Sequence, residues 1–159
     1  VTHLELRDYP LPIYDGDIEA AGMPETVRRL QQVMREHDGL LISTPEYNGS
    51  MPALVKNTLD WISRPMADGT SGTTLFRGKV AGICSASPGA LGGIRSLIVL
   101  RDALAKLGLW VAPSQVALGN ADSAFDANDE LIDAKRREAV QAVARETVRA
   151  AQALLRPAR

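Results

Sequence analysis

Hydrophobic residues along this chain gather into three short, nearly continuous runs, which lie at 39–44, 79–86 and, interrupted by a proline, 110–118. Runs of this length are typical of parallel strands that are buried on both faces. Residues 1–6 instead alternate between apolar and polar side chains, which predicts a further strand. The pattern therefore predicts a sheet.

Between these runs, apolar residues recur every three or four positions, which predicts amphipathic helices. Proline and glycine residues bound them, as expected at helix ends. The predicted helices begin near Pro24, Ser50, Ile94 and Asn128, and the last and longest reaches Leu155 before Pro157 ends it.

Strands that alternate with helices predict an α/β fold, with a parallel sheet and helices on both of its faces. We found no internal repeat, low-complexity tract or linker, so residues 1–159 are expected to form a single domain. Ligands of such folds bind at the C-terminal ends of the strands. Two segments occupy that place, and we name them the tyrosine loop (45–50) and the glycine loop (87–93). The sequence thus predicts a site formed by these two loops.

The composition and charge of the chain argue against some kinds of partner and location for this protein. The chain has 45% hydrophobic residues, 18 basic and 19 acidic residues, and a net charge of -1, so nucleic acid is not an expected partner. No segment approaches the roughly 18 apolar residues of a membrane span, and the N-terminus has no signal-peptide pattern. The single cysteine, Cys84, excludes an intrachain disulfide and favours a cytoplasmic protein. We interpret Cys84 as a small buried hydrophobe, and His3 and His37 as isolated histidines.

The segment from Pro45 to Trp61 is dense in polar and aromatic residues that a plain turn does not need. It reads Pro-Glu-Tyr-Asn-Gly-Ser-Met-Pro-Ala-Leu-Val-Lys-Asn-Thr-Leu-Asp-Trp, and a Ser-Pro-Gly and Gly-Gly loop follows the next strand. Together these motifs closely resemble the NAD(P)H-dependent FMN reductase family, which includes quinone, azo-dye and chromate reductases. The resemblance covers nearly the whole chain and implies a flavodoxin-like, doubly wound parallel sheet in three α/β/α layers.

The resemblance places FMN between the two loops. A flavin ring is a flat apolar plate with polar edges, so its site needs backbone that approaches closely, an apolar wall and a few polar groups. We expect Tyr47 to lie against the ring, and Glu46 and Asn48 to meet its pyrimidine edge. The predicted cofactor-binding residues are Pro45, Glu46, Tyr47, Asn48, Gly49, Ser87, Pro88, Gly89, Gly92 and Gly93.

The family relationship also implies an activity and partners. Hydride would pass from NADPH or NADH through FMN to a small acceptor, in two alternating steps that need little acid–base machinery. Quinones, flavins, azo compounds and metal oxyanions all remain open as acceptors. The family commonly forms homodimers or homotetramers, and its dimer contact uses the helix that here carries Lys56, Asn57, Asp60 and Trp61.

The chain departs from the family pattern at its start. The family opens with a strand and a loop that holds the FMN phosphate, whereas residues 1–12 resemble its second strand, so about thirty residues of the pattern have no match. We considered an N-terminus that is unrecorded, truncated or supplied by another subunit. Without about three phosphate hydrogen bonds, FMN binding is expected to weaken on the order of 10³-fold or more.

Two other functions fit the same features less well. One is a flavodoxin-type electron carrier, but the near-neutral net charge does not indicate an acidic docking surface. The other is a cofactor-free structural or interaction subunit, which only the unmatched start favours. Steady-state oxidation of NADH or NADPH separates a reductase from both.

Overall fold

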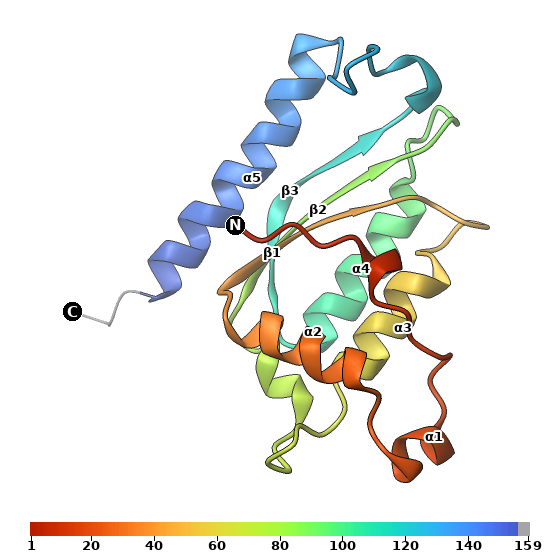
Figure 1. Ribbon diagram of the computed structural model, residues 1–159. Coiled ribbons are helices and arrows are strands. Elements are labelled where there is room, and N and C mark those ends of the chain that lie inside the picture. Colours follow the sequence, from red (N-terminus) through yellow and green to blue (C-terminus); the bar gives the residue numbers. More distant parts are fainter. Residues whose placement is uncertain (156–159) are drawn as a thin grey trace. The chain divides into compact units, whose positions relative to one another are not determined.

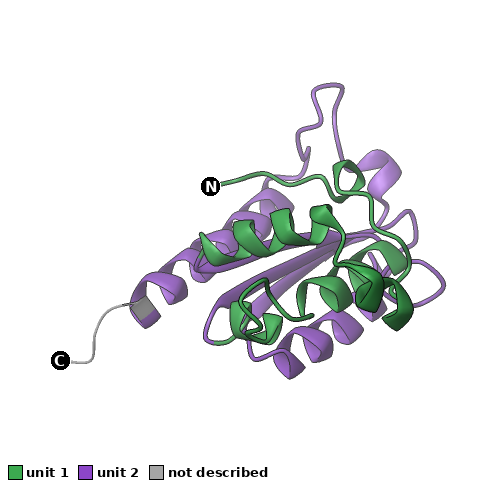
Figure 2. Ribbon diagram, turned by 60° about the horizontal axis from the view of Figure 1, so that its bottom comes forward, with its two compact units in different colours: residues 1–37, 53–77 green, residues 38–52, 78–159 purple. Residues whose placement is uncertain are grey.

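The computed structural model describes residues 1–155 (Figure 1). Its internal contacts group residues 1–37 and 53–77 into one compact unit, unit 1, and residues 38–52 and 78–159 into another, unit 2 (Figure 2). Both predicted loops belong to unit 2. The predicted helix end at Pro157 lies outside the described residues.

The described part of unit 2 contains a parallel sheet of three strands: β1 (Gly39–Thr44), β2 (Val80–Ala86) and β3 (Trp110–Leu118). Their order in the sheet is β1-β2-β3, so β2 is central. These strands confirm the three continuous apolar runs of the sequence to within one residue. Because the strands are parallel, their C-terminal ends meet at one edge of the sheet.

Burial differs between the central strand and β1. Five of the seven residues of β2 are buried, as predicted. The prediction that 39–44 is buried on both faces is wrong, because Leu41 is 55% exposed and only Thr44 is buried. Among the described residues β1 is an edge strand with β2 as its one partner, and an edge strand lacks the cover of a second neighbour.

Two helices cover the sheet of unit 2 from opposite sides (Figure 1). The helix α4 (Ile94–Lys106) packs on β2 and β3, and α5 (Ala134–Leu155) packs on all three strands. Close approach of α5 to the centre of the sheet depends on Gly82, where a Cβ would lie 2.2 Å from the Thr147 hydroxyl oxygen. The central strand is thereby fixed between two helices.

The last helix begins later than predicted. It starts at Ala134, not near Asn128, because the Asp133 carboxylate accepts hydrogen bonds from the backbone N–H groups of Lys135 and Arg136, at 2.8 and 3.1 Å. An aspartate that accepts from the second and third residues of a helix is a typical N-cap. Ile132 precedes the helix and is 62% exposed.

Unit 1 is helical, and the predicted strand at 1–6 is wrong. Within residues 1–155 no strand pairs with this segment, and a strand without a hydrogen-bonded neighbour is not stable. The predicted helix near Pro24 is confirmed. The elements of unit 1 are η1 (Leu6–Asp8), α1 (Gly16–Ala21), α2 (Glu25–Arg35), α3 (Ala53–Ile62) and η2 (Gly72–Leu75).

Side-chain hydrogen bonds fix the N-terminal segment of unit 1 to α3. The Asn57 amide donates to the Pro12 carbonyl and accepts from the backbone N–H of Tyr14, both at 2.8 Å. The indole N–H of Trp61, a side chain that is fully buried, also donates to the Pro12 carbonyl, at 2.8 Å, and its ring meets Tyr14 edge-on at 5.0 Å between centroids. In the structure Asn57 and Trp61 therefore act in the core of unit 1.

Candidate functional site

The two predicted loops begin side by side. Thr44, the last residue of β1, is paired with Ser85 in β2, so the tyrosine loop and the glycine loop leave the same edge of the sheet. This is the edge at which parallel α/β sheets bind ligands. The structure therefore brings together two segments that are separated by 36 residues in sequence, between residues 50 and 87.

The tyrosine loop is a tight turn. Tyr47 and Ser50 exchange two backbone hydrogen bonds, with N to O distances of 3.0 and 3.1 Å. The two residues between them, Asn48 and Gly49, have φ angles of 51° and 76°. Positive φ at both central positions is typical of a type I′ turn, for which Asn-Gly is the preferred pair. The turn leaves the Tyr47 side chain 62% exposed.

The glycine loop folds back onto the sheet. The Ser85 hydroxyl donates to the carbonyl of Gly92 at 2.7 Å, and Gly92 and Gly93 both have positive φ. A Cβ on Gly92 would lie 2.5 Å from the carbonyl carbon of Ala117 in β3. Gly89 is different, because a Cβ there would meet only the Ser87 hydroxyl, at 3.7 Å. Backbone packing thus requires Gly92, whereas Gly89 is exposed.

A third loop, which follows β3, also reaches the glycine loop. The backbone N–H of Asn120 donates to the Gly89 carbonyl at 3.3 Å, and that of Ala121 donates to the Ser87 carbonyl at 3.1 Å. The sequence prediction missed this contribution. Its signal was the Gly119-Asn120 pair directly after the third strand, which marks a turn at the same edge of the sheet.

Glu46 connects the tyrosine loop to the helix that follows the glycine loop. Its carboxylate accepts from the backbone N–H groups of Arg95 and Ser96, at 2.9 and 3.3 Å, and pairs with the Arg95 guanidinium at 3.2 Å. The Glu46 side chain is only 13% exposed. Sequence reasoning missed Arg95, although it lies only two residues after the Gly92-Gly93 pair.

The ten predicted cofactor-binding residues fall into three groups by exposure. Only the residues of the exposed and half-buried groups have substantial surface that solvent can reach. Exposed are Pro45, Tyr47, Asn48, Pro88 and Gly89; half-buried are Glu46, Gly49 and Ser87; buried are Gly92 and Gly93.

Outside the two loops, the described residues include few other side chains that are candidates for a catalytic or metal-binding role. Residues 1–155 contain no cluster of three or more histidine, cysteine, aspartate or glutamate side chains that could hold a metal ion. Burial raises the pKa of the half-buried Cys84 thiol, which opposes a role as a nucleophile. His37 is hydrogen-bonded to Thr2 at 2.9 Å and to the Val33 carbonyl at 2.8 Å. The Lys56–Asp60 pair on α3 is exposed, with an N to O distance of 2.8 Å.

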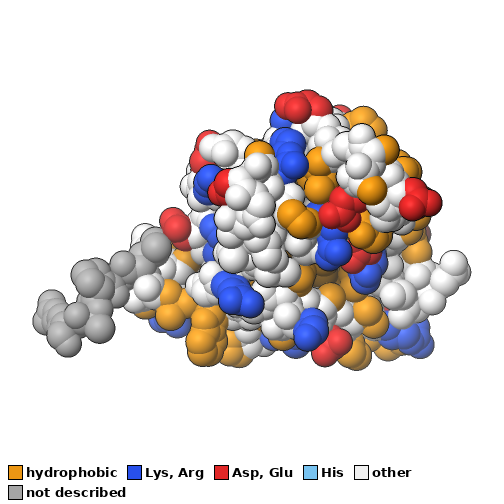
Figure 3. Space-filling view, turned by 90° about the horizontal axis from the view of Figure 1, so that it is seen from below, with side chains coloured by type: hydrophobic (Ala, Val, Ile, Leu, Met, Phe, Trp, Pro, Cys, Tyr) orange, Lys and Arg blue, Asp and Glu red, His pale blue; other side chains and the backbone are white. Residues whose placement is uncertain are grey.

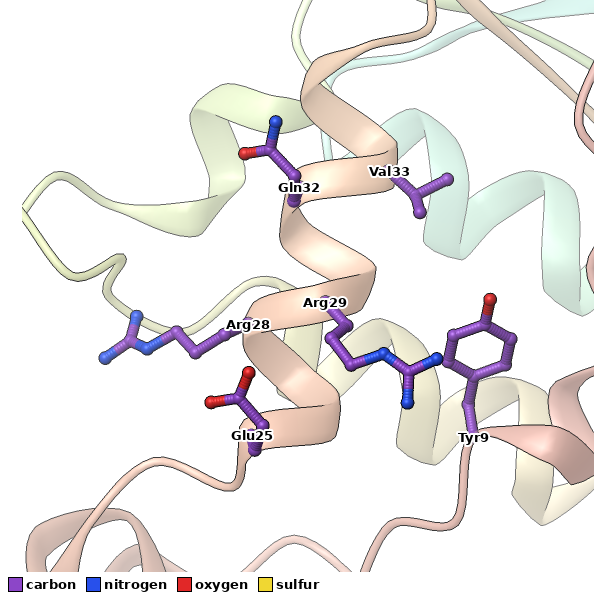
Figure 4. Close-up of a pocket in the computed structure, with 6 residues that line it drawn as sticks. All are labelled: Tyr9, Glu25, Arg28, Arg29, Gln32 and Val33. Carbon is purple, nitrogen blue, oxygen red and sulfur yellow. The ribbon is translucent and has the colours of Figure 1, made fainter.

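Unit 1 has a surface pocket of its own, of about 430 Å³. It lies along one side of α2, where the Arg29 guanidinium stacks over the Tyr9 ring at 5.2 Å from its centroid (Figure 4). None of the predicted cofactor-binding residues lines it. The lining residues are Tyr9, Glu25, Arg28, Arg29, Gln32 and Val33.

On the face in Figure 3, Lys and Arg side chains are interspersed with Asp and Glu side chains. None of the helices that the structure describes is long and apolar enough to cross a membrane.

Comparison with known proteins identifies relatives. The family described as NADPH-dependent FMN reductase matches residues 1–123. An NAD(P)H-dependent FMN reductase of Pseudomonas aeruginosa is 39% identical over 140 residues, which cover 87% of this chain and 72% of that protein. A quinone reductase of Pseudomonas putida is 38% identical over 127 residues, which cover 79% of this chain and 66% of that protein.

A third relative and a solved structure agree with these two. A 2-hydroxy-1,4-benzoquinone reductase of a Burkholderia species is 36% identical over 132 residues, which cover 82% of this chain and 69% of that protein. The structure of FerB, a flavoenzyme NAD(P)H:acceptor oxidoreductase from Paracoccus denitrificans, matches with a TM-score of 0.78 and 28% identity, over 94% of this chain and 79% of that one. The flavodoxin-like α/β fold is thereby confirmed. The matches cover between 66% and 79% of the length of these four proteins.

Proposed function

Because the chain belongs to the NADPH-dependent FMN reductase family, we propose that it is an FMN-dependent oxidoreductase that passes hydride from NADPH or NADH to a small acceptor. A quinone is the first acceptor to test, since two of the relatives above are named quinone reductases. Flavins, azo compounds and metal oxyanions are the further candidates. We also propose that the protein self-associates as a homodimer or homotetramer.

The observation that carries this proposal is the meeting of the tyrosine loop and the glycine loop at one edge of the sheet. The exposed Tyr47 ring supplies an aromatic wall, and the exposed Gly89 lets a planar group approach the backbone. These features fit the isoalloxazine ring of FMN. When bound, FMN supplies the hydride chemistry, because it accepts hydride from nicotinamide and passes it on.

The residues of the chain then have distinct roles. Tyr47 packs against the ring, and Asn48 offers an amide that hydrogen-bonds the polar edge of the ring. Pro45, Ser87 and Pro88 complete the walls of the site. Gly92 and Gly93 lie below the surface and hold the glycine loop in shape.

The test is a visible spectrum of the purified protein together with an assay of nicotinamide oxidation. We expect flavin absorption after incubation with FMN, and oxidation of NADH or NADPH that depends on added benzoquinone. NADH and NADPH are assayed in separate reactions, and a reaction with free FMN but no protein is the control. A protein that takes up no FMN contradicts the proposal. FMN binding without nicotinamide turnover would instead identify an electron carrier, which receives its electrons from another protein.

A further inference from the structure

The Glu46 side chain turns away from the exposed surface of the tyrosine loop. Its neighbours Pro45 and Tyr47 are exposed, whereas Glu46 is 13% exposed and its two carboxylate oxygens have donors in α4. A carboxylate that is removed from solvent to this extent needs such partners, because an unpaired buried charge is costly. The partners of Glu46 all lie in Arg95 and Ser96.

The N-terminus of α4 has no cap of its own. The residue at the N-cap position is Gly93, which has no side chain to accept hydrogen bonds. The Glu46 carboxylate accepts instead from Arg95 and Ser96, the second and third residues of the helix, which are the usual donors to an N-cap side chain. Its negative charge also lies at the positive end of the helix dipole. Glu46 therefore caps α4 from another loop.

Glycine at position 93 makes room for this arrangement. A Cβ at Gly93 would lie 3.0 Å from the Cβ and Oγ of Ser85 and 3.4 Å from the Cβ of Glu46. The φ of 85° at Gly93 is also unfavourable for residues with a side chain. A local N-cap side chain at this position is thus unfavourable, and the cap comes from the tyrosine loop.

We propose that Glu46 is a positioning residue, which fixes the tyrosine loop to the glycine loop and so sets the separation of the two walls between which FMN binds. This inference rests on the proposed function and refines it: Glu46 does not touch the flavin but holds the residues that do. Tyr47 follows Glu46 directly, and Gly93 directly precedes α4, so a movement of the Glu46 carboxylate shifts both walls.

The test compares Glu46→Ala and Glu46→Gln with a control variant, Glu138→Gln. Glu138 forms an ion pair with Arg145 on α5 and is 65% exposed, so its loss removes a carboxylate–arginine pair without joining two loops. Each variant is measured for urea unfolding, amide hydrogen exchange without ligand, FMN affinity and the visible circular dichroism of bound FMN. Glutamine keeps the shape and one carbonyl acceptor, so Glu46→Gln is the conservative variant.

We expect the Arg95 amide of Glu46→Ala to exchange about tenfold faster or more, and FMN affinity to fall about tenfold, which corresponds to about 1.4 kcal/mol. The circular dichroism of the bound flavin should change at saturating FMN, where incomplete binding no longer contributes. Glu46→Gln should recover part of each effect, and Glu138→Gln should resemble the wild type.

Two results would overturn the inference. Faster amide exchange with unchanged FMN affinity and unchanged circular dichroism means that Glu46 caps the helix and has no influence on the site. Wild-type exchange of Arg95 and Ser96 in Glu46→Ala means that there is no tether. If the wild-type protein itself binds no FMN, the proposed function fails, and the exchange rates still decide whether Glu46 joins the two loops.

Discussion

The tyrosine loop and the glycine loop leave neighbouring strands, yet they are built in different ways. The tyrosine loop presents exposed side chains on a turn that two backbone hydrogen bonds close. The glycine loop presents backbone, and its buried end packs so closely on β3 that a Cβ does not fit at Gly92. The tyrosine loop is therefore characterised by its exposed side chains, and the glycine loop by the absence of a Cβ at a closely packed position.

This difference predicts how each loop responds to substitution. Changing an exposed side chain of the tyrosine loop should remove a contact with the proposed flavin and leave the folded chain intact. Adding a side chain to the buried end of the glycine loop forces backbone atoms apart and costs stability first. Substitutions in the tyrosine loop should therefore lower FMN affinity with little change in stability. Substitutions at the buried end of the glycine loop should mainly lower stability.

The largest effect is expected for Gly92→Ala. The new Cβ would lie 2.5 Å from the Ala117 carbonyl carbon and 2.6 Å from the Gly119 nitrogen, at a residue whose φ is 61°. Strain in the left-handed region and overpacking together predict a loss of about 3 kcal/mol in the free energy of unfolding. Urea unfolding measures this loss.

Gly89→Ala is the matched control within the same loop. A Cβ there would make only an ordinary contact, 3.7 Å from the Ser87 hydroxyl oxygen. The free energy of unfolding should change by less than about 0.5 kcal/mol, while FMN affinity should fall because the methyl group keeps the ring from the backbone. Equal destabilisation by Gly89→Ala and Gly92→Ala would show that the loop is not divided into a packed and an open end.

The sequence predicts the three strands of unit 2 better than it predicts residues 1–6. Continuous apolar runs identify 39–44, 79–86 and 110–118 as strands, although only the central strand β2 is buried to the extent that such a run predicts. Parallel strands then place both loops at one edge of the sheet. The segment 1–6 was misassigned because alternation reports only a tendency to form a strand. A strand forms only where a neighbouring strand pairs with it through hydrogen bonds, and none of the described strands pairs with residues 1–6.

The sequence predicts that the two loops lie together, but not the contacts that join them. Motif residues marked both loops, yet the sequence alone assigned Glu46 to the flavin edge, whereas in the structure its carboxylate is bonded to the start of α4. A hydrogen bond between residues 49 positions apart has no local pattern. The Gly93-Ile94 helix start without a capping side chain was the one indication that a cap had to come from elsewhere.

A smaller effect is expected for Tyr47→Ala in the tyrosine loop. Because the ring is 62% exposed, its removal should change the free energy of unfolding by less than about 0.5 kcal/mol. The loss of ring stacking should weaken FMN binding about tenfold, as measured by quenching of flavin fluorescence. Tyr9→Ala in unit 1 is the control, since Tyr9 stacks with Arg29 outside the predicted site. Unchanged FMN affinity in Tyr47→Ala would remove Tyr47 from the wall of the site.

The smallest effect concerns Cys84, which lies in β2 three residues before the glycine loop begins. Burial raises the pKa of its thiol, so at pH 8 less of it is thiolate than in a free cysteine, and thiolate is the reactive form. A disulfide reagent should therefore label the native protein more slowly than the urea-unfolded protein, and raising the pH should increase the native rate. Gly92→Ala, which strains the adjacent loop, should label faster than Gly89→Ala because the strained loop opens more often. Equal labelling rates in the two variants would mean that opening of the glycine loop does not control access of the reagent to Cys84. The close packing at Gly92 would then affect only the contacts of Gly92 with β3.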